Sequence, residues 1–383
     1  MSVSLWQRRA TRTRSCDLAI IGGGIAGLSA AIDARARGCS AIVLERGRPG
    51  SGASGRNAGF LMRGAADNYA VACGLWGRER ARALWRFNEE NIEELRMLGI
   101  AGLPSYAARP SCLVALDEVE ESELRQSATL LRDDGFDVEL VEPGAIDDTL
   151  WTRAKPRVGL INPHDAVINP VDLLGLLASK LPEEIVCPGE EVFAIEQAAG
   201  AMRVHSSTCT IEAGAVLVCL NAFAANLLPE LAGVVVPNRG QMLALRPAGR
   251  VRLNHAYYVN RGGEYLREGP DGLVIIGGAR RHFEAAERSL VDEPNNDVQG
   301  RIEQYARQWI ADDYHVVARW AGIMGFSPDG QPLVGQVRPG VWFCGGFTGH
   351  GMSMAQKTAR TAVGAIVDGV PSLFDMTRIG YAC

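Results

Sequence analysis

The stretch DLAIIGGGIAGLSAAIDARARG, residues 17–38, runs from an apolar segment of strand length through three glycines into an alanine-rich segment with helical spacing. Gly22, Gly24 and Gly27 fit the pattern G-x-G-x-x-G between the predicted strand and helix. In such a turn the first glycine permits a tight bend, the second lets a pyrophosphate approach the backbone, and the third lets the helix pack on the strand. The stretch therefore predicts an α/β unit that binds a dinucleotide.

The next predicted strand supports this interpretation. Residues 40–47, SAIVLERG, form an apolar run that ends in Glu45. An acid at this position accepts hydrogen bonds from the adenosine ribose and disfavours a 2′-phosphate, so FAD or NAD is favoured over NADP. The alternative is a glycine turn that only packs a helix on a strand, and the context and the spacing of the acid argue against it.

Composition limits the classes of function. The chain has 383 residues, 47% hydrophobic and 22% charged, with a formal net charge of −5. The length favours two domains, and the net charge gives no basic field for nucleic acid. No stretch reaches the ~18 apolar residues of a membrane span. The nine cysteines form no C-x-x-C pair and no metal-ligand spacing, so we expect reduced thiols, no metal and a cytoplasmic protein.

The remaining pattern predicts two interleaved domains. Residues 234–278 contain successive short apolar runs separated by turn residues, which indicates an antiparallel sheet. The basic segment 1–15 has no apolar run that would make it a cleavable signal, so we predict an unstructured lead, with a targeting segment as the alternative. We assign residues 16–80, 152–232 and 318–383 to the nucleotide domain, and 81–151 and 233–317 to the second domain.

Several segments follow one another in a specific order after Cys16: IIGGGIAGLSAA, GASGRNAGF, AVINPVDLL, VPNRGQM, WAGIMGFSPDGQPLVG and GGFTGHGM. In this order they resemble the FAD-dependent amino acid and amine oxidoreductases related to D-amino acid oxidase, glycine oxidase and sarcosine oxidase. NAFAANLLPEL and PNRGQM are most similar to the gamma-glutamylputrescine oxidase branch. The resemblance implies an α/β fold: a glutathione-reductase-type, Rossmann-like FAD domain and an α+β substrate domain whose antiparallel sheet covers the isoalloxazine ring.

The resemblance also implies which positions hold FAD. The glycines of the first turn hold the pyrophosphate, Glu45 the ribose, Ser54 with its loop the inner phosphate, and the backbone of Val192 the adenine. The N-terminus of the last helix, after GGFTGHGM, lies beside the flavin pyrimidine, where its dipole stabilises negative charge. The implied cofactor positions are Gly22, Gly24, Ile25, Ala26, Gly27, Glu45, Arg46, Ser54, Asn57, Ala58, Gly59, Val192, Asn221, Gly322, Gly346, Gly349, His350, Gly351 and Met352.

Two departures from the family concern the flavin. Some relatives attach it through a cysteine at the position of Gly322, and no histidine stands in the Ser54 loop, so we expect non-covalent FAD. Sarcosine-oxidase-like members carry an oxygen-activating lysine where this chain has Ile275. Oxygen is therefore a doubtful electron acceptor, and another acceptor is the alternative; Lys155 is a possible substitute for the missing lysine.

Further departures concern the substrate. The carboxylate anchors of glycine oxidase and sarcosine oxidase correspond here to Met324 and Ser353. Tyr265 matches the substrate-facing tyrosine of glycine oxidase, with a core aromatic as the alternative. The other candidates are His350, as a base or as part of a structural turn, and three arginines that are either a substitute cation or solvated surface residues. These arginines are Arg63, Arg267 and Arg280.

The resulting hypothesis is an enzyme that removes hydride from the carbon next to the nitrogen of a small amine or amino acid, passes it to flavin N5 and leaves an imine that hydrolyses. Small free α-amino acids are expected to be poor substrates, because Met324 replaces the arginine clamp. An FAD-dependent 2-hydroxy acid dehydrogenase is the first alternative, with His350 as its base. An FAD-binding assembly factor without turnover is the second. The sequence does not determine the oligomeric state.

Overall fold

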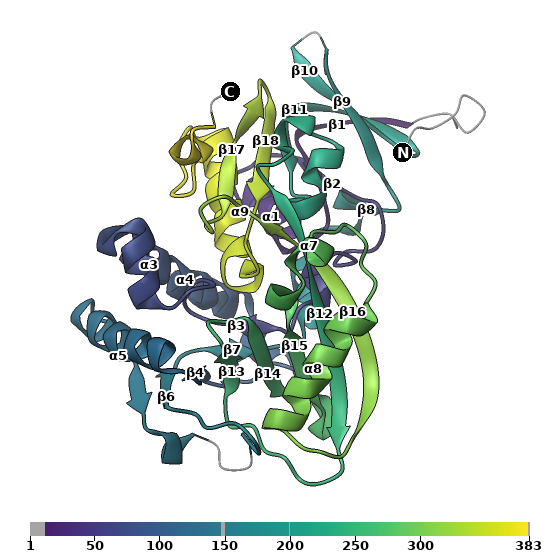
Figure 1. Cartoon of the computed structure of the whole chain (residues 1–383). Helices are drawn as coiled ribbons and strands as arrows, with labels where there is room; N and C mark the ends of the chain where they lie inside the picture. Colours follow the sequence, from purple (N-terminus) through teal and green to yellow (C-terminus); the bar gives the residue numbers. More distant parts are fainter. Residues whose placement is uncertain (1–11, 147–149, 199, 382–383) are drawn as a thin grey trace. The chain divides into compact units, whose positions relative to one another are not determined.

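The computed structural model describes residues 12–146, 150–198 and 200–381. Its contacts divide the chain into two compact units (Figure 1). The first unit contains the residues up to Gly55, Val171–Pro237 and the residues from Met324 onward; the second contains Arg56–Pro170 and Asn238–Ile323. The second unit thus includes residues 56–80 and 152–170, which the sequence pattern grouped with the nucleotide domain.

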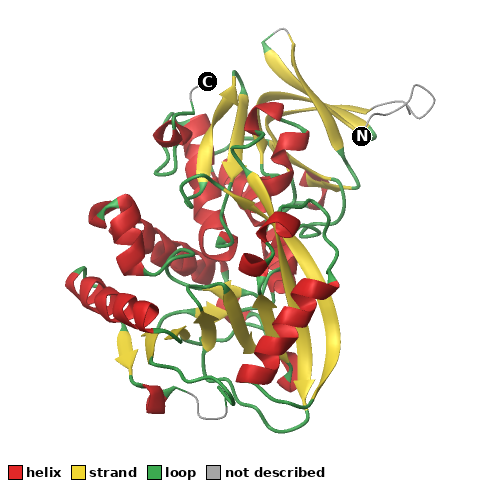
Figure 2. Cartoon of the chain, viewed as in Figure 1, coloured by secondary structure: helices red, strands yellow, loops and turns green. Residues whose placement is uncertain are grey.

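The first unit is built on an eight-stranded sheet with the order β17-β18-β11-β1-β2-β8, and β10 joins β11 to β9. Figure 2 shows the strands in yellow and the helices in red. β1 pairs in parallel with β2 and β11, and β11 pairs in parallel with β18. The strands are β1 (Arg12–Ile21), β2 (Ala41–Glu45), β8 (Val186–Pro188), β9 (Val192–Ala198), β10 (Ala201–Ser206), β11 (Cys209–Val218), β17 (Leu333–Arg338) and β18 (Val341–Gly345). The longer helices are α1 (Ile25–Ala36), α6 (Pro170–Ser179) and α9 (Gly351–Val367).

The first strand corrects one expectation. We predicted an unstructured lead through residue 15, but β1 already begins at Arg12. The reason is long-range: Arg12 to Cys16 pair with Cys209 to Ala213 of β11. Residues 1–11 of the predicted lead lie outside the described residues.

Small side chains explain how the first helix packs. Ala30, Ala31 and Ala34 of α1 are fully buried, as are Ala19 and Ile20 of β1. Alanine lets a helix approach its neighbours closely while keeping a high helix propensity. α1 therefore packs closely against β1, β2 and α9, and it begins directly after Gly24.

The second unit is built on another eight-stranded sheet, in the order β16-β12-β15-β14-β13-β4-β6-β5. The strands β12, β13, β14 and β15 pair antiparallel with one another, as do β4, β5 and β6, whereas β13 pairs in parallel with β4, so the predicted antiparallel sheet is confirmed. The strands are β4 (Ser111–Ala115), β5 (Glu139–Val141), β6 (Val158–Asn162), β12 (Val236–Pro247), β13 (Ala256–Val259), β14 (Glu264–Glu268), β15 (Val274–Gly278) and β16 (Tyr314–Phe326), with β3 (Phe60–Leu61) and β7 (Ala166–Val167) forming a small separate sheet.

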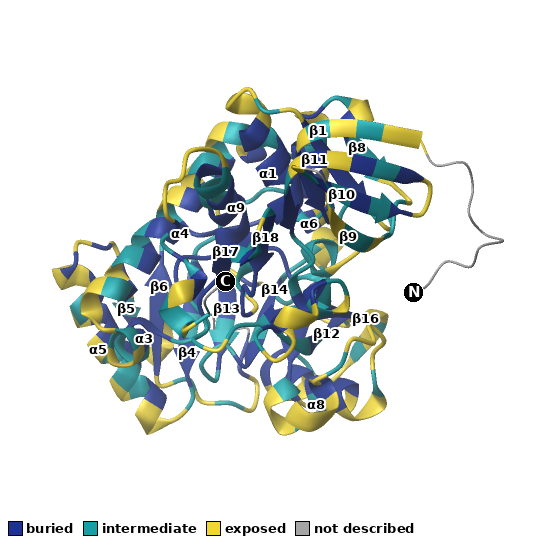
Figure 3. Ribbon diagram, turned by 90° about the horizontal axis from the view of Figure 1, so that it is seen from above, coloured by how far each residue is buried: buried dark blue, intermediate teal, exposed yellow. Residues whose placement is uncertain are grey.

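The two faces of this sheet differ. One face packs on α8 (Asn296–Trp309), where Leu266, Ile276 and Trp309 form a buried core. The other face carries Met242, Tyr258, Tyr265, Ile275 and Trp320. Figure 3 shows the buried strands β4 and β13, and the exposed outer sides of α8 and α5 (Glu118–Asp133). The unit also contains α3 (Tyr69–Trp76), α4 (Arg78–Leu98) and α7 (Glu284–Glu287), and the short helix α2 (Ala53–Arg56) ends at its first residue.

Candidate functional site

The segment Gly22–Gly27, where β1 turns into α1, has no space for a side chain at Gly22, Gly24 or Gly27; we call it the glycine turn. Gly22 has φ 111°, and a Cβ there would lie 2.8 Å from the carbonyl oxygen of Cys219. A Cβ on Gly24 would lie 2.8 Å from Oγ of Ser54, and one on Gly27 would lie 1.8 Å from the carbonyl oxygen of Gly22. The turn therefore exposes backbone, which a phosphate can approach closely.

The carboxylate of Glu45 is held in one orientation at the end of β2. Oε2 accepts a hydrogen bond from the backbone N–H of Gly23 and Oε1 accepts one from Gly47, both at 2.8 Å. A carboxylate has about four acceptor positions, so both oxygens retain capacity for the hydroxyls of a ribose. At the start of α1 the Ser54 hydroxyl accepts from Ile25 N–H at 3.1 Å, and Gly24 at the N-cap position offers no side-chain cap.

The start of α9 is a second backbone-lined turn. Asn221, Gly346, Thr348 and Gly349 all have positive φ, and Oδ1 of Asn221 accepts a hydrogen bond from Gly346 N–H at 2.9 Å. His350 occupies the N-cap position without a side-chain cap, and its N–H donates to the carbonyl of Phe347 at 2.9 Å. The helix is 17 residues long. Its N-terminus is an oriented set of donors suited to a negatively charged group.

The other predicted positions near these two turns are also located. Met352 is buried in the first turn of α9, next to Gly351. Met324 contributes its sulfur to the same region, 3.5 Å from where a Cβ on Gly349 would lie. Arg46 lies over the ring of Phe223, at 4.8 Å from the centroid. Val192 is the first residue of β9, and Ala26 is buried in α1.

The loop Asn57–Gly59 belongs to the second unit. Oδ1 of Asn57 accepts from the N–H of Gly59 at 2.7 Å. Gly59 has φ 74°, and a Cβ there would lie 1.9 Å from the carbonyl oxygen of Ile168. Ala58 is buried, and its carbonyl accepts a hydrogen bond from the Arg267 guanidinium. This loop, like the glycine turn, leaves no room for larger side chains.

The position that carries a cysteine in some relatives is also crowded. A Cβ on Gly322 would lie 3.0 Å from Cβ of Arg56. Arg56 is held there because its carbonyl accepts from Nε1 of Trp320 at 2.9 Å and its guanidinium donates to the carbonyl of Ala321 at 3.1 Å. Non-covalent attachment of FAD stays a prediction.

Two tyrosines stand opposite each other on the face of the second sheet that does not pack on α8. Tyr258 of β13 and Tyr265 of β14 are register partners, and their rings stack with centroids 5.9 Å apart. Phe60 meets both rings edge-on, at 5.3 and 6.1 Å. Tyr265 lies over Gly277, where a Cβ would come within 2.6 Å of the ring. We call Phe60, Tyr258 and Tyr265 the tyrosine face.

Tyr258 was not among the residues predicted from the sequence, although its hairpin pairing is readable there. Asn260 and Gly263 enclose a two-residue turn, Arg261-Gly262, in which both residues have positive φ. This is the geometry of a tight hairpin, which pairs residues at equal distances from its centre. The segment YYVNRGGEY therefore pairs its Tyr258 with Tyr265.

The three candidate arginines have different surroundings. The guanidinium of Arg63 donates to Glu89 at 2.6 Å and to Oδ1 of Asn162 at 2.9 Å. Arg267 donates to the carbonyls of Ala58, Ile168 and Glu268, and burial lowers its pKa to about 10. Both side chains are buried, so the surface alternative is wrong for them.

Arg280 differs from these two arginines. It lies two residues after the end of β15. The residue between them, Ala279, has a left-handed conformation with φ 62°. Burial raises the pKa of both Tyr258 and Tyr265, and the positive charge of Arg280 opposes this rise for each phenol. Arg280 is therefore the candidate cation that acts on the tyrosine face.

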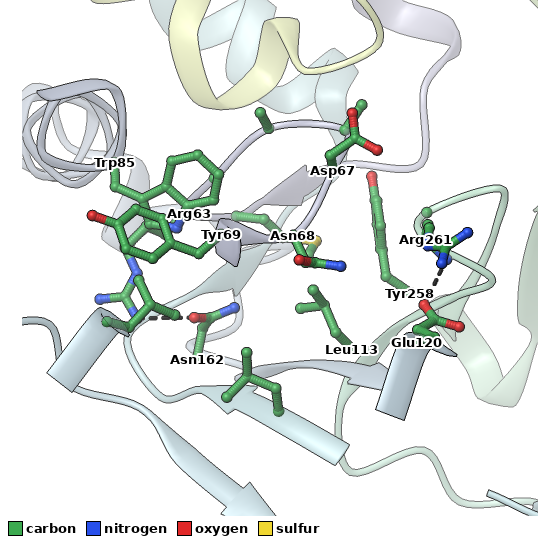
Figure 4. Close-up of a pocket in the computed structure, with 17 residues that line it drawn as sticks. Arg63, Asp67, Asn68, Tyr69, Trp85, Leu113, Glu120, Asn162, Tyr258 and Arg261 are labelled. Carbon is green, nitrogen blue, oxygen red and sulfur yellow. Dashed lines mark hydrogen bonds between the residues drawn. The ribbon is translucent and has the colours of Figure 1, made fainter. Parts of the chain in front are cut away.

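A small pocket lies beside the tyrosine face, wholly within the second unit (Figure 4). Its volume is about 30 Å³, and Tyr258 belongs both to its lining and to the tyrosine face. Arg63 and Asn162 lie at one end, and Glu120 and Arg261 lie at the other. No local pattern in the sequence predicts this pocket, because its lining comes from distant segments.

Residues 12–146, 150–198 and 200–381 show neither a metal site nor a membrane-spanning helix. No group of three or more His, Cys, Asp or Glu side chains among them is arranged to hold a metal ion. None of the described helices is long and apolar enough to cross a membrane.

Comparison with known proteins gives consistent matches. The model of the family described as FAD dependent oxidoreductase matches residues 17–363. A glycine oxidase of Geobacillus kaustophilus is 26% identical over 95% of this chain and 96% of its own. A gamma-glutamylputrescine oxidoreductase of Escherichia coli is 25% identical over 90% and 82%. The structure of L-proline dehydrogenase from P. horikoshii superposes with a TM-score of 0.78 and 19% identity over 96% of this chain and 99% of that one.

Proposed function

The chain belongs to the FAD dependent oxidoreductase family, and from that premise we propose that it oxidises the C–N bond of an amine or amino acid. It is an FAD-binding flavoenzyme with the mixed α/β fold of this family. The names of its relatives, glycine oxidase and gamma-glutamylputrescine oxidoreductase, support a nitrogen substrate. The observation that carries the proposal is the tyrosine face beside the charge of Arg280.

The residues present fit FAD. The glycine turn lets a pyrophosphate approach, Glu45 keeps acceptor capacity for a ribose, and the turn before α9 presents backbone donors. Bound FAD supplies the hydride acceptor. The protein's own residues then bind the substrate, orient it and exclude water from it.

The tyrosine face suits an uncharged amine. Phe60, Tyr258 and Tyr265 form an aromatic wall, and the raised pKa values keep both phenols neutral. Burying an ammonium against such a wall without a partner is costly, so the reacting nitrogen binds best as the free amine. Arg280 would bind the carboxylate of an amino acid through charge-assisted hydrogen bonds.

A 2-hydroxy acid substrate is the second candidate, and it makes different demands. A base must take the hydroxyl proton as hydride leaves the carbon. Both phenols stay protonated because their pKa values are raised, so neither can take this proton, and the backbone of His350 forms part of the α9 turn. The amine substrate is therefore favoured.

Anaerobic reduction of the bound flavin tests the proposal. We expect the flavin absorbance of the purified holoenzyme to bleach with members of an amine and amino acid panel and to persist with 2-hydroxy acids of matched size. Bleaching by hydroxy acids alone would replace the proposal with the alternative substrate. A flavin that no substrate reduces, but that dithionite does, would indicate an assembly factor.

We further propose that the reduced enzyme passes its electrons mainly to an acceptor other than oxygen. Ile275, on β15, packs against the apolar cluster of the sheet face that does not pack on α8, and it supplies no charge. A nearby cation promotes oxygen reduction because it stabilises the negative charge that develops on oxygen. Lys155 is exposed and does not contribute to this cluster.

A further inference from the structure

The chain bends sharply where β15 ends, directly before Arg280; we call residues 278–279 the β15 bend. Gly278 has φ 128°, and a Cβ there would lie 2.4 Å from the carbonyl oxygen of Gly263. Ala279 has φ 62° and is fully buried. A residue with a side chain is strained in this left-handed region and stays there only where its surroundings hold it. The β15 bend therefore needs a partner.

Glu264, the first residue of β14, is that partner. It is only 2% exposed, and its Oε1 accepts a hydrogen bond from the backbone N–H of Ala279 at 3.2 Å. Its Oε2 accepts one from the side-chain amide of Asn260 at 2.6 Å, and Asn260 also has a positive φ, 52°. One carboxylate thus joins two left-handed residues, one in the β15 bend and one in the turn between β13 and β14.

A carboxylate suits this position better than an amide of the same size. Both of its partners are N–H donors. A carboxylate accepts at both oxygens, whereas a glutamine would turn its own N–H groups toward one of the two donors. Hydrogen bonds to a charged acceptor are also stronger than neutral ones. The glutamate therefore holds the β15 bend in a way that glutamine does not reproduce.

Glu264 acts from the face of the sheet opposite the tyrosine face. Side chains alternate along a strand, so Glu264 and Leu266 share one face of β14 and Tyr265 lies on the other. Leu266 and Ala279 both belong to the core that packs on α8. Glu264 therefore does not touch a molecule bound at the tyrosine face, and it acts on such a molecule only through the backbone that it holds.

Arg280 stands between two residues that are fixed to the hairpin of β13 and β14. On one side, Glu264 holds Ala279. On the other side, the guanidinium of Arg281 donates to two backbone carbonyls of the hairpin turn, both at 2.8 Å. The same hairpin carries the two tyrosines of the tyrosine face, and these tyrosines and Arg280 are only partly buried. The direction of the Arg280 side chain is thus set relative to the tyrosine face.

We propose that Glu264 is a positioning residue: it holds the β15 bend and thereby aims Arg280 at the carboxylate of an amino acid substrate. This inference rests on the proposed function, in which Arg280 binds that carboxylate, and it names a residue that sets the selectivity of the site. Charge-assisted hydrogen bonds of a guanidinium depend on its orientation. A relaxed bend should therefore weaken the binding of amino acids more than that of amines.

Matched variants and matched ligands test the inference. The variant is Glu264→Gln. The control is Glu120→Gln, the same substitution at another buried glutamate, which accepts from the N–H of Arg261 in the same hairpin turn (Figure 4). The ligands are racemic proline and pyrrolidine, which differ only by the carboxylate. Calorimetry measures the Kd of each on the full-length holoenzyme with its flavin reduced by dithionite, and anaerobic flavin reduction gives kcat/KM.

We expect the wild type to bind proline about thirtyfold more tightly than pyrrolidine, or better. Glu264→Gln should lower this preference about tenfold, and Glu120→Gln should keep it. In an Arg280→Met background, Glu264→Gln should change the preference less than about twofold, because it acts through this arginine.

Three results would overturn the inference: equal binding of the two ligands to the wild type, an equal fall of the preference in Glu264→Gln and Glu120→Gln, and a further tenfold fall in the Arg280→Met background. If Glu264→Gln does not fold, Glu264→Asp decides, because the shorter side chain does not reach both donors. We expect the preference to fall there too, and an unchanged preference would refute the positioning role.

Binding to the reduced enzyme also separates this inference from the proposed function. If no amine or amino acid bleaches the oxidised flavin, oxidation of the C–N bond fails, but the binding preference still tests Glu264. If amines and amino acids bleach the flavin and Glu264→Gln keeps the wild-type preference, only the positioning role is refuted.

Discussion

The glycine turn is built from backbone within one short segment, whereas the tyrosine face is built from side chains on separate strands. A Cβ at Gly27 would lie 1.8 Å from the carbonyl of Gly22, five residues earlier in the chain. Tyr258 and Tyr265 meet only because β13 and β14 pair, and Phe60 reaches them from a separate small sheet. The bend of the glycine turn therefore depends mainly on local conformation, and the tyrosine face depends on long-range packing.

The largest expected effect is a loss of flavin binding. Gly27→Ala places a Cβ against the Gly22 carbonyl, so the turn must open and its pyrophosphate contacts are lost. We expect the purified protein to retain less than about a hundredth of the wild-type flavin content, because several backbone contacts fail together. Flavin absorbance per protein measures this, with circular dichroism to monitor folding. Gly52→Ala is the matched control, since a Cβ there meets nothing within 4 Å; full flavin content in Gly27→Ala would contradict the role of the turn.

The next largest expected effect is a loss of activity without a loss of flavin. Gly277→Val would push a side chain into the ring of Tyr265, which a Cβ alone would approach to 2.6 Å. We expect kcat/KM for the best amine to fall by roughly a hundredfold, because a misplaced binding surface loses near-attack geometry. Flavin content should stay at the wild-type level. A parallel loss of flavin would show that the two regions are not separable.

Arg280 is expected to affect the choice between substrates and not the binding of the cofactor. Arg280→Met removes the cation that acts on both tyrosines but keeps a side chain of similar length. We expect kcat/KM for an amino acid, relative to its decarboxylated amine, to fall by roughly thirtyfold. The ratio cancels effects on folding and on flavin loading. An unchanged ratio would place the carboxylate elsewhere.

Ile275 sharpens the question of the electron acceptor. Ile275→Lys introduces a cation on the face of the second sheet that does not pack on α8, where the native residue is apolar. We expect reoxidation of the reduced flavin by air to become about tenfold faster in this variant, because the cation stabilises charge on reduced oxygen. Stopped-flow absorbance measures it, with a quinone as the alternative acceptor. Fast reoxidation of the wild type by air would reject the non-oxygen acceptor.

The smallest expected effect is a pH dependence of stability. Burial raises the pKa of Glu120 from 4.5 to about 7; Asp117 and Glu123 raise it further, and the backbone N–H and charge of Arg261 oppose the rise. Between these values the folded chain keeps a proton that the unfolded chain has released, so stability falls as the pH rises. Relative to Glu120→Gln, the wild type should lose on the order of 1 kcal/mol of unfolding free energy from about pH 5 to about pH 8. Urea unfolding at each pH measures this difference, and a constant difference would contradict the assignment.

The sequence alone determined the features that depend on neighbouring residues. The G-x-G-x-x-G turn, Glu45 at a strand end and the glycine-rich start of α9 are each contained in one segment, so their geometry follows from local backbone preferences. The order of these segments was sufficient to indicate the fold and the cofactor. The antiparallel second sheet was also predictable, from short apolar runs between turn residues.

Only the tertiary structure decided which side chains meet. Positions 63, 267 and 280 all hold arginine, so the sequence does not distinguish them. Arg63 and Arg267 are buried against partners from distant segments, whereas Arg280 acts on the tyrosine face. Arg12–Ser15 form a strand because β11 pairs with them from nearly 200 residues away. The pocket shown in Figure 4 is lined by residues of helix α5 and of the turn between β13 and β14. Such contacts depend on the packing of whole elements, which residue spacing along the chain does not determine.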